Sequence, residues 1–181
     1  TVISIPLAVL AVRVRGLATP TLAVSSLLYT IPSLALITGL WPIFGLSTTT
    51  VIVALALYSI LVILRNAIVG LQNVPKHVTA AARGMGYRET QILVRVSLPV
   101  ALPAVMAGIR LATVSTVGLV MIGALVGHGG LGSLVLNGFT NNFYHAPILL
   151  GMVLAIVLAL ALEWLLSGLQ WAVTPWERGR R

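Results

Sequence analysis

Long apolar stretches with few charged positions dominate the chain. Residues 16–64 contain no charged residue, a run of 49 positions, and Arg110 is the only fixed charge in residues 98–145. Glu163 is the only charge in residues 146–176. A helix that crosses a membrane needs about 20 mostly apolar residues. The pattern predicts four complete crossings, at residues 17–44, 48–64, 103–126 and 148–171.

The first predicted crossing contains Pro20, Pro32 and Pro42. Proline removes a backbone donor and clashes with the preceding turn, so we expect this helix to be kinked or broken. Residues 2–12 are apolar but too short to span, and the chain begins with Thr1, so we expect this segment to finish a helix that starts upstream. The expected fold is all-α: a polytopic membrane bundle of about five helices, the first truncated, in a single domain of residues 1–181.

The composition supports a membrane protein. Hydrophobic residues make up 59% of the chain and charged residues 8%, with a mean hydropathy of +1.07. Soluble domains average roughly 45–50% and 25%. An ordinary soluble domain, a disordered chain and a coiled coil are therefore excluded. The absence of cysteine also excludes disulfides and thiolate metal sites.

The net charge of +8 follows from the distribution of basic residues. If the chain crosses the membrane back and forth at the predicted spans, ten of its eleven lysines and arginines lie on one side. The loops on the other side, near residue 47 and at 127–147, carry none. Such asymmetry marks the cytoplasmic side, which then also holds the C-terminus. The charge therefore indicates topology and not nucleic-acid binding. The ten residues are Arg13, Arg15, Arg65, Lys76, Arg83, Arg88, Arg95, Arg178, Arg180 and Arg181.

The longest predicted cytoplasmic connection, residues 65–98, is predicted to form two short helices. Asn73 can cap the first and Pro75 suits its first turn. Gly84 or Gly86 is expected to end it.

The second short helix is expected at residues 87–97, where Ile92, Leu93 and Val96 form an apolar face. Pro99 and Pro103 are expected to stop or bend the chain beyond this helix. A connection of this length usually carries function.

This connection resembles the signature loop of ABC-importer permeases, whose pattern is E-A-A-x3-G-x9-I-x-L-P. The matching run is Ala80-Ala81-Ala82-Arg83-Gly84-Met85-Gly86, nine residues, then Val96-Ser97-Leu98-Pro99. Ala80 replaces the glutamate and Val96 the isoleucine. Other segments are similar to the permeases of glycine betaine, carnitine and choline importers, and they lie at residues 29–35, 63–66, 102–110 and 127–132.

The resemblance implies a type I importer permease of the bacterial inner membrane that is not itself an enzyme. A second permease, identical or related, would complete the pathway. Two ATPase subunits would bind ATP and Mg²⁺, so this chain needs no cofactor. An extracytoplasmic binding protein would deliver glycine betaine, choline or carnitine. The coupling residues implied are Ala80, Ala81, Ala82, Arg83, Gly84, Gly86 and Arg88.

Three alternatives remain from the sequence. A permease for methionine or another small solute would share the loop. A channel or secondary transporter would explain the helices but not the loop. A structural membrane protein is supported only by small-residue helix contacts. Copurification with an ATPase would separate the importers from the other two.

A glycine-rich loop at residues 127–132 matches the dinucleotide-binding pattern G-x-G-x-x-G. That motif needs a preceding strand and an acidic residue about 20 positions later, whereas here a membrane helix precedes it and Glu163 is the next acid. We interpret the loop as a break that lets the chain turn or helices pack, with a gate as the alternative. The residues given this loop or gate role are Pro99, Pro103, Gly127, Gly129, Gly130 and Gly132.

No catalytic or metal-binding set is present in the sequence. No Ser/His/acid constellation suggests itself, and His77, His128 and His145 lack the spacing of metal ligands.

Two charges lie inside predicted crossings, and such residues usually face a bundle interior. Arg110 lies 12 positions after Leu98, and Glu163 lies 12 positions before Pro175. Both counts start at the cytoplasmic end of the segment, so the two residues should lie at similar depth and are expected to pair or share a polar cluster. The alternative is that each snorkels or pairs elsewhere.

Three aromatic residues could meet a quaternary ammonium ion. Trp41, Tyr29 and Tyr58 offer ring faces that attract cations. The alternative is that they are interfacial anchors or core residues. The sequence therefore assigns no substrate-binding residue.

Overall fold

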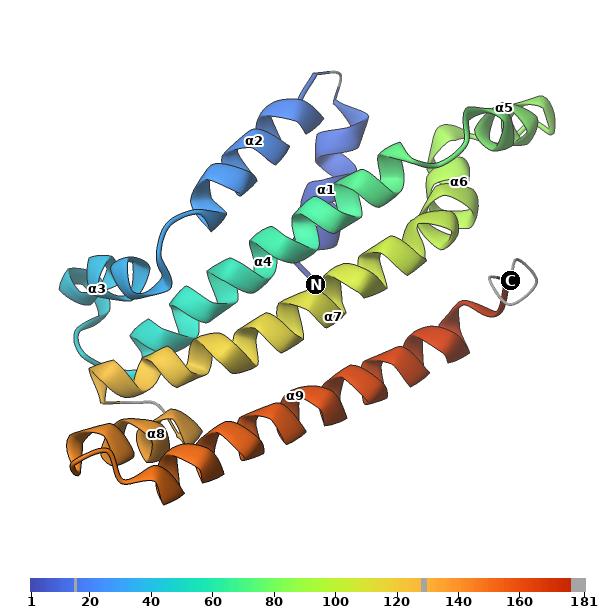
Figure 1. Ribbon diagram of the computed structural model, residues 1–181. Helices are drawn as coiled ribbons and strands as arrows, with labels where there is room; N and C mark the ends of the chain where they lie inside the picture. Colours follow the sequence, from blue (N-terminus) through green and yellow to red (C-terminus); the bar gives the residue numbers. More distant parts are fainter. Residues whose placement is uncertain (15, 128–129, 177–181) are drawn as a thin grey trace. The chain divides into compact units, whose positions relative to one another are not determined.

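The computed structural model describes residues 1–14, 16–127 and 130–176, and every regular element in these ranges is helical (Figure 1). Several residues named in the sequence analysis lie outside the described ranges: Arg15, His128, Gly129, Arg178, Arg180 and Arg181. The elements are α1 (Ser4–Arg13), α2 (Ala18–Tyr29), α3 (Ser33–Phe44), α4 (Thr48–Gln72), α5 (Lys76–Gly84), α6 (Glu89–Ile92), a π-helical turn η1 (Leu93–Ser97), α7 (Leu98–Gly123), a 3₁₀ turn η2 (Ala124–Val126), α8 (Leu131–Thr140) and α9 (His145–Val173).

Three helical stretches in the described residues are long and apolar enough to cross a membrane: α4, the run from α6 through η2, and α9. The pair α2 and α3 qualifies together as a fourth, broken span. The expected break in the first crossing is confirmed. It falls at Pro32, whose extended backbone (φ −58°, ψ 134°) separates the two helices. Pro42, by contrast, lies inside α3 without ending it.

The second crossing is longer than predicted, because α4 continues to Gln72 instead of ending near residue 64. Leu64, Ala67, Ile68 and Leu71 recur at helical spacing and are all buried, so the apolar face continues past the charge at Arg65. Arg65 therefore lies on an exposed side of a helix, not in a loop.

The chain forms two compact units. The first comprises residues 1–28, 60–109 and 168–181. Alanines make up four of the nine residues of its core, and the Ser4 hydroxyl donates to the Ile60 carbonyl at 3.3 Å. The core residues are Ala8, Ala11, Leu64, Ala67, Ile68, Leu71, Val74, Ala101 and Val105. Small residues let helix backbones approach closely without a large hydrophobic driving force, as membrane packing requires.

The second unit comprises residues 29–59 and 110–167. A hydroxyl pair, Ser59 and Thr116 at 3.0 Å, links α4 to α7. One stripe of α9 faces its neighbours, with Gly151, Ala155 and Ala159 four residues apart, while most of its large apolar side chains are exposed. Such a surface suits lipid or another protein in the membrane.

The first turn of α8 packs tightly against the end of α7. A Cβ added at Gly132 would lie 2.5 Å from the Met121 carbonyl oxygen, and a backbone atom cannot move aside easily. We expect Gly132→Ala to destabilise the protein by about 1–3 kcal/mol. Gly118→Ala is the matched control, because nothing lies within 4 Å of the added carbon. Thermal unfolding in detergent measures both, and equal melting temperatures would contradict the close contact.

Candidate functional site

The predicted coupling loop contains one well-formed short helix, α5, followed by a tight turn into α6. The predicted cap is wrong: Pro75 occupies the N-cap position, with φ −60° and ψ 130°, and no side chain caps the helix. The Asn73 backbone N–H instead donates to the Val69 carbonyl, completing the last turn of α4. Proline's fixed φ and missing donor suit the position where a new helix begins.

The end of α5 explains which glycine the motif requires. Gly84 is the last helical residue, and Gly86 adopts a left-handed φ of +81°. The Gly86 N–H donates to the Arg83 carbonyl and the Tyr87 N–H to the Ala82 carbonyl. This pair of bonds is the Schellman motif, which satisfies the orphan carbonyls of a helix end. Gly86 therefore ends the helix by its backbone conformation.

An ion pair spans this turn. Arg83 Nε donates to Glu89 Oε1 at 2.6 Å and a second guanidinium nitrogen donates to Oε2 at 3.2 Å, a forked arrangement. The hydrogen bond to Glu89, with that charge's attraction, raises the pKa of Arg83 above its ordinary value. The resemblance implied a coupling role for Arg83. In the structure it joins the last turn of α5 to the first turn of α6.

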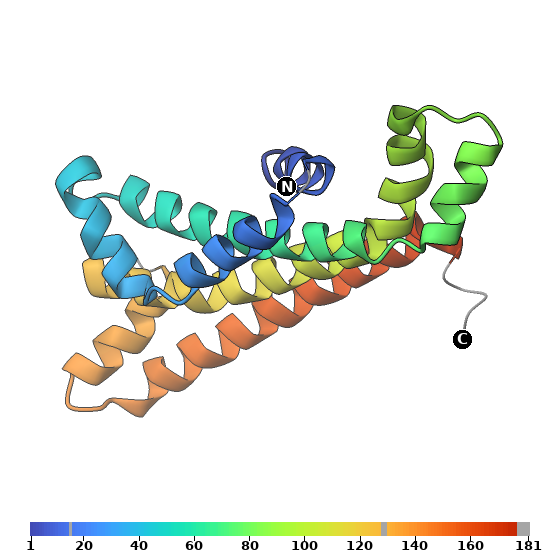
Figure 2. The same ribbon diagram turned by 90° about the horizontal axis from the view of Figure 1, so that it is seen from above.

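The prolines after the loop do not stop the helix. The chain runs from Glu89 to Val126 as one helical stretch. The turn before Pro99 widens into η1, where the Leu98 N–H donates to the Leu93 carbonyl five residues back. A π-turn accommodates a proline that lacks a donor and clashes with the carbonyl four residues earlier. Figure 2 shows the helix changing direction between α6 and α7. The prolines were expected to stop or bend the chain; the helix continues through them, and the bend that is found precedes them.

One face of α5 is exposed, and three of its positions carry small side chains or none. Four exposed residues lie three, one and three positions apart along the helix: His77, Ala80, Ala81 and Gly84. Met85, the next residue in the chain, is 72% exposed. We call these five residues the α5 face.

Ala82 differs from its neighbours in the motif. It is 2% exposed and packs inside the loop. Arg88 is exposed and marks the N-terminal end of α6, where its backbone N–H donates to the Gln91 side chain at 2.8 Å. The motif therefore contains both surface positions and a structural one.

The described glycines of the 127–132 loop have distinct roles. Gly127 ends η2 in the left-handed region at φ +83°, and Gly130 begins α8 at φ +47°. Gly132 allows the close contact between α8 and α7. These observations support a turn and a packing contact, and α7 and η2, not a strand, precede the loop.

The structure brings Arg110 and Glu163 together. Arg110 Nε donates to Glu163 Oε1 at 2.9 Å, and a terminal guanidinium nitrogen donates to the same oxygen. Their side chains are 30% and 28% exposed. Both residues belong to spanning helices, α7 and α9, so the pair links them. The sequence-based expectation of pairing is confirmed.

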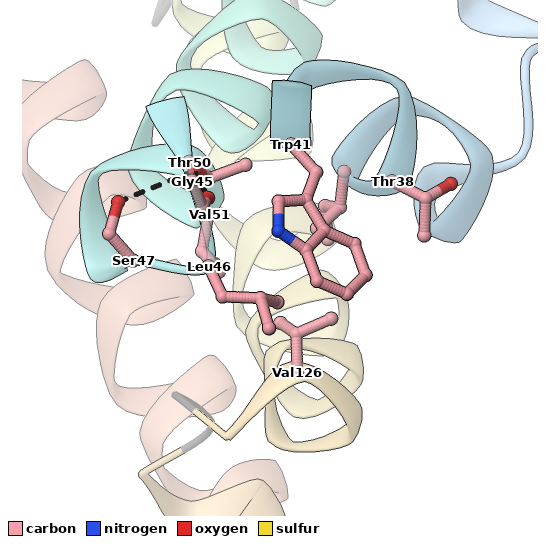
Figure 3. Close-up of a pocket in the computed structure, with 9 residues that line it drawn as sticks. Thr38, Trp41, Gly45, Leu46, Ser47, Thr50, Val51 and Val126 are labelled. Atoms are coloured by element: carbon pink, nitrogen blue, oxygen red, sulfur yellow. Dashed lines mark hydrogen bonds between the residues drawn. The ribbon is translucent and has the colours of Figure 1, made fainter. Parts of the chain in front are cut away.

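The three aromatic residues considered for cation binding lie in two different places. Tyr29 and Tyr58 meet edge to face with ring centroids 5.8 Å apart, and the Tyr58 hydroxyl donates to the Ile31 carbonyl at the α2–α3 break. Trp41 instead lines a shallow hollow beside the turn from α3 into α4 (Figure 3). The residues that line this hollow are Ile37, Thr38, Trp41, Gly45, Leu46, Ser47, Thr50, Val51 and Val126.

Sequence reasoning missed three features. The helix α8 lies inside a predicted loop, although its apolar residues are spaced for a helix. The Arg83–Glu89 pair joins residues on two helices whose turn geometry was unknown. The hollow depends on Val126, far from Trp41 in sequence. No group of three potential metal ligands occurs within the described ranges.

Comparison with known proteins identifies the family. Residues 1–174 match the family "binding-protein-dependent transport system inner membrane component". The chain therefore belongs to this family of transport permeases, and it is an inner membrane component.

The relatives are permeases of osmoprotectant importers. The osmoprotectant import permease OsmW of Salmonella typhimurium is 40% identical, over 96% of this chain and 83% of its own length. The carnitine transport permease OpuCB of Listeria monocytogenes is 35% identical, over 96% and 79%. The choline transport system permease OpuBD of Bacillus subtilis is 35% identical, over 99% and 79%.

A solved structure shares the fold. A chain of the MetNI methionine ABC transporter in an inward-facing conformation has a TM-score of 0.81 with 25% identity, and the match covers 96% of this chain and 87% of that one. The predicted all-helical permease fold of type I ABC importers is therefore confirmed.

Proposed function

We propose that this chain is the permease subunit of an ATP-driven importer for quaternary-ammonium compatible solutes such as glycine betaine, choline or carnitine. The observation that carries the proposal is the combination of the α5 loop with relatives that are 31–40% identical over nearly the whole chain and are named for such cargoes. The likeness to a methionine transporter makes methionine the second candidate, at 25% identity.

In this proposal the α5 face is the docking surface for a separate ATPase subunit that binds ATP and Mg²⁺. Small side chains at Ala80, Ala81 and Gly84 let a partner's surface approach the helix backbone. The Schellman turn and the Arg83–Glu89 pair hold α5 on α6, so a pull on α5 is passed into α7. A second permease, identical or related, completes the pathway, and a binding protein supplies the cargo from the extracytoplasmic side.

The sidedness follows from the positive-inside rule. The end of α4, the α5 loop and the end of α9 then face the cytoplasm, together with the C-terminus. The turn from α3 into α4 and the region around α8 face outward.

The docking proposal predicts that Ala81→Trp weakens ATPase binding roughly tenfold or more, because an indole separates the two surfaces. Ala81 is exposed, so the loop itself should still fold. Thr90→Trp is the matched control, since Thr90 is exposed on α6, off the α5 face. Copurification and ATP hydrolysis in proteoliposomes measure the effect. An ATPase that binds Ala81→Trp as well as the native chain would refute the docking surface.

The cargo is tested by uptake into the same proteoliposomes with the cognate binding protein. Radiolabelled glycine betaine, choline and methionine are compared at equal concentrations. We expect ATP-dependent uptake of the quaternary ammonium compounds. Uptake of methionine alone would leave the importer assignment standing and replace the cargo. Uptake without ATP would favour the channel or secondary transporter.

A further inference from the structure

The hollow beside Trp41 presents an aromatic ring, and the described residues that line it are all uncharged. The Trp41 side chain is exposed to 45%, and no charged side chain is among the lining residues. Figure 3 shows the indole ring with Leu46 and Val126 around the hollow. The surface is therefore apolar apart from the Thr38 hydroxyl, which donates to the Leu34 carbonyl within α3 at 3.0 Å, and the hydroxyls of the α3–α4 turn.

The hydroxyls of that turn are engaged in holding it. Thr50 Oγ1 donates to the Gly45 carbonyl at 2.6 Å, and Ser47 Oγ donates to the Phe44 carbonyl at 3.0 Å. Gly45 adopts a φ of +69°, which a side chain would strain. The polar groups thus fix the turn beside Trp41, and the ring and aliphatic side chains supply most of the contact surface for a ligand.

A quaternary ammonium ion suits such a surface. It carries a positive charge but has no N–H to donate, so hydrogen-bond acceptors are not needed to recognise it. The face of a tryptophan attracts it more strongly than other rings, and its methyl groups match aliphatic neighbours such as Val51. None of the described lining residues is Lys or Arg, so none of them repels a cation.

The hollow also lies on the side where cargo arrives. The α3–α4 turn and η2, which contributes Val126, both adjoin connections without lysine or arginine. The positive-inside rule assigns these connections to the extracytoplasmic side. A binding protein releases its cargo on that side.

We propose that the Trp41 hollow is an entry site for the quaternary ammonium group of the cargo. The inference rests on the proposed function and adds the position of a contact. A single ring adds only a modest attraction for such an ion. The site is therefore weak, as an entry site must be if the cargo is to move on.

The test uses the assembled permease–ATPase complex in nanodiscs without binding protein. Saturation-transfer NMR of the choline methyl protons detects weak binding, and its concentration dependence gives the dissociation constant. The variants are Trp41→Leu and Trp41→Phe. Trp164→Leu is the matched control, because Trp164 lies on α9 and is 74% exposed. The tert-butyl analogue of choline, with carbon in place of nitrogen, tests the role of the charge.

We expect Trp41→Leu to raise the dissociation constant roughly 3- to 10-fold, with Trp41→Phe between it and the native complex and Trp164→Leu unchanged. The neutral analogue should bind more weakly than choline to the native complex. This second comparison needs no variant, so it holds even if Trp41→Leu fails to assemble.

Equal binding of choline and its neutral analogue would overturn the proposal, because the hollow would then be only an apolar surface. Unchanged binding by Trp41→Leu in an assembled complex would overturn it too. If either of these results is found and the native importer still takes up glycine betaine and choline, only the entry-site proposal fails. If the native importer takes up neither compound, the proposed function fails and the entry site with it.

Discussion

Replacing Gly86 with valine should uncouple the permease from its ATPase. At φ +81° Gly86 occupies a backbone region that costs an L-residue about 1–2 kcal/mol, and more for a β-branched side chain. Nothing lies within 4 Å of an added Cβ, so the backbone and not crowding sets the effect. The Schellman turn should open, which releases α5 from its position on α6.

Gly168→Val is the matched control for this substitution. Gly168 lies within α9, away from the α5 face, and an added Cβ there also meets nothing within 4 Å. Because Gly168 is helical, valine should be tolerated or slightly stabilising.

The contrast is measured as cargo-stimulated ATP hydrolysis in proteoliposomes. Gly86→Val should reduce it roughly 5- to 30-fold, with Gly86→Asn less affected because asparagine tolerates the left-handed region. Equal activity of Gly86→Val and Gly168→Val would show that the turn does not position α5 for the ATPase. Circular dichroism of the purified chain checks that the helices persist.

Reversing either charge of the Arg110–Glu163 pair should have a second large effect. Two hydrogen bonds from Arg110 converge on one carboxylate oxygen of Glu163, and the two residues lie in helices that span the membrane. Breaking a buried pair by changing one partner costs about 3–5 kcal/mol, because a charge remains without its counterion. The side chains are partly exposed, so we expect about 2–4 kcal/mol here.

The double reversal, Arg110→Glu with Glu163→Arg, distinguishes pairing from a simple need for each residue. It should restore most of the thermal stability that Arg110→Glu or Glu163→Arg alone removes. Arg95→Glu, on the exposed side of η1, is the control for charge reversal and should cost little. A double variant no more stable than the single ones would contradict a direct interaction.

Hydrophobic patterning was enough to predict the helical spans, because lipid requires long uninterrupted apolar segments. The pairing of Arg110 with Glu163 was also predictable, since intramembrane charges at similar depth have few other ways to be satisfied. The exact ends of the helices were harder to predict from the sequence. The end of α4 depended on whether Arg65 faced solvent, and this is decided by the core residues on the opposite side of the helix.

Other parts of the site depended on local backbone geometry that a residue pattern does not specify. The sequence offered Gly84 and Gly86 as equivalent helix ends, and only the hydrogen bonds of the turn separate them. Ala82 and Ala81 looked alike, but one is buried and the other exposed. The roles within the motif therefore required the three-dimensional arrangement of α5 on α6.

The π-helical turn at Leu93–Ser97 has a consequence for chain length. A π-turn accommodates one residue more than an α-turn, so removing one residue there would let a regular helix continue from Glu89 into α7. Each residue of an α-helix corresponds to a rotation of about 100° and a rise of about 1.5 Å. Such a deletion would turn α6, and α5 with it, about the axis of α7. The orientation of α5 therefore depends on a single inserted residue, and a change in length at this point would redirect α5 without altering any side chain on its exposed face.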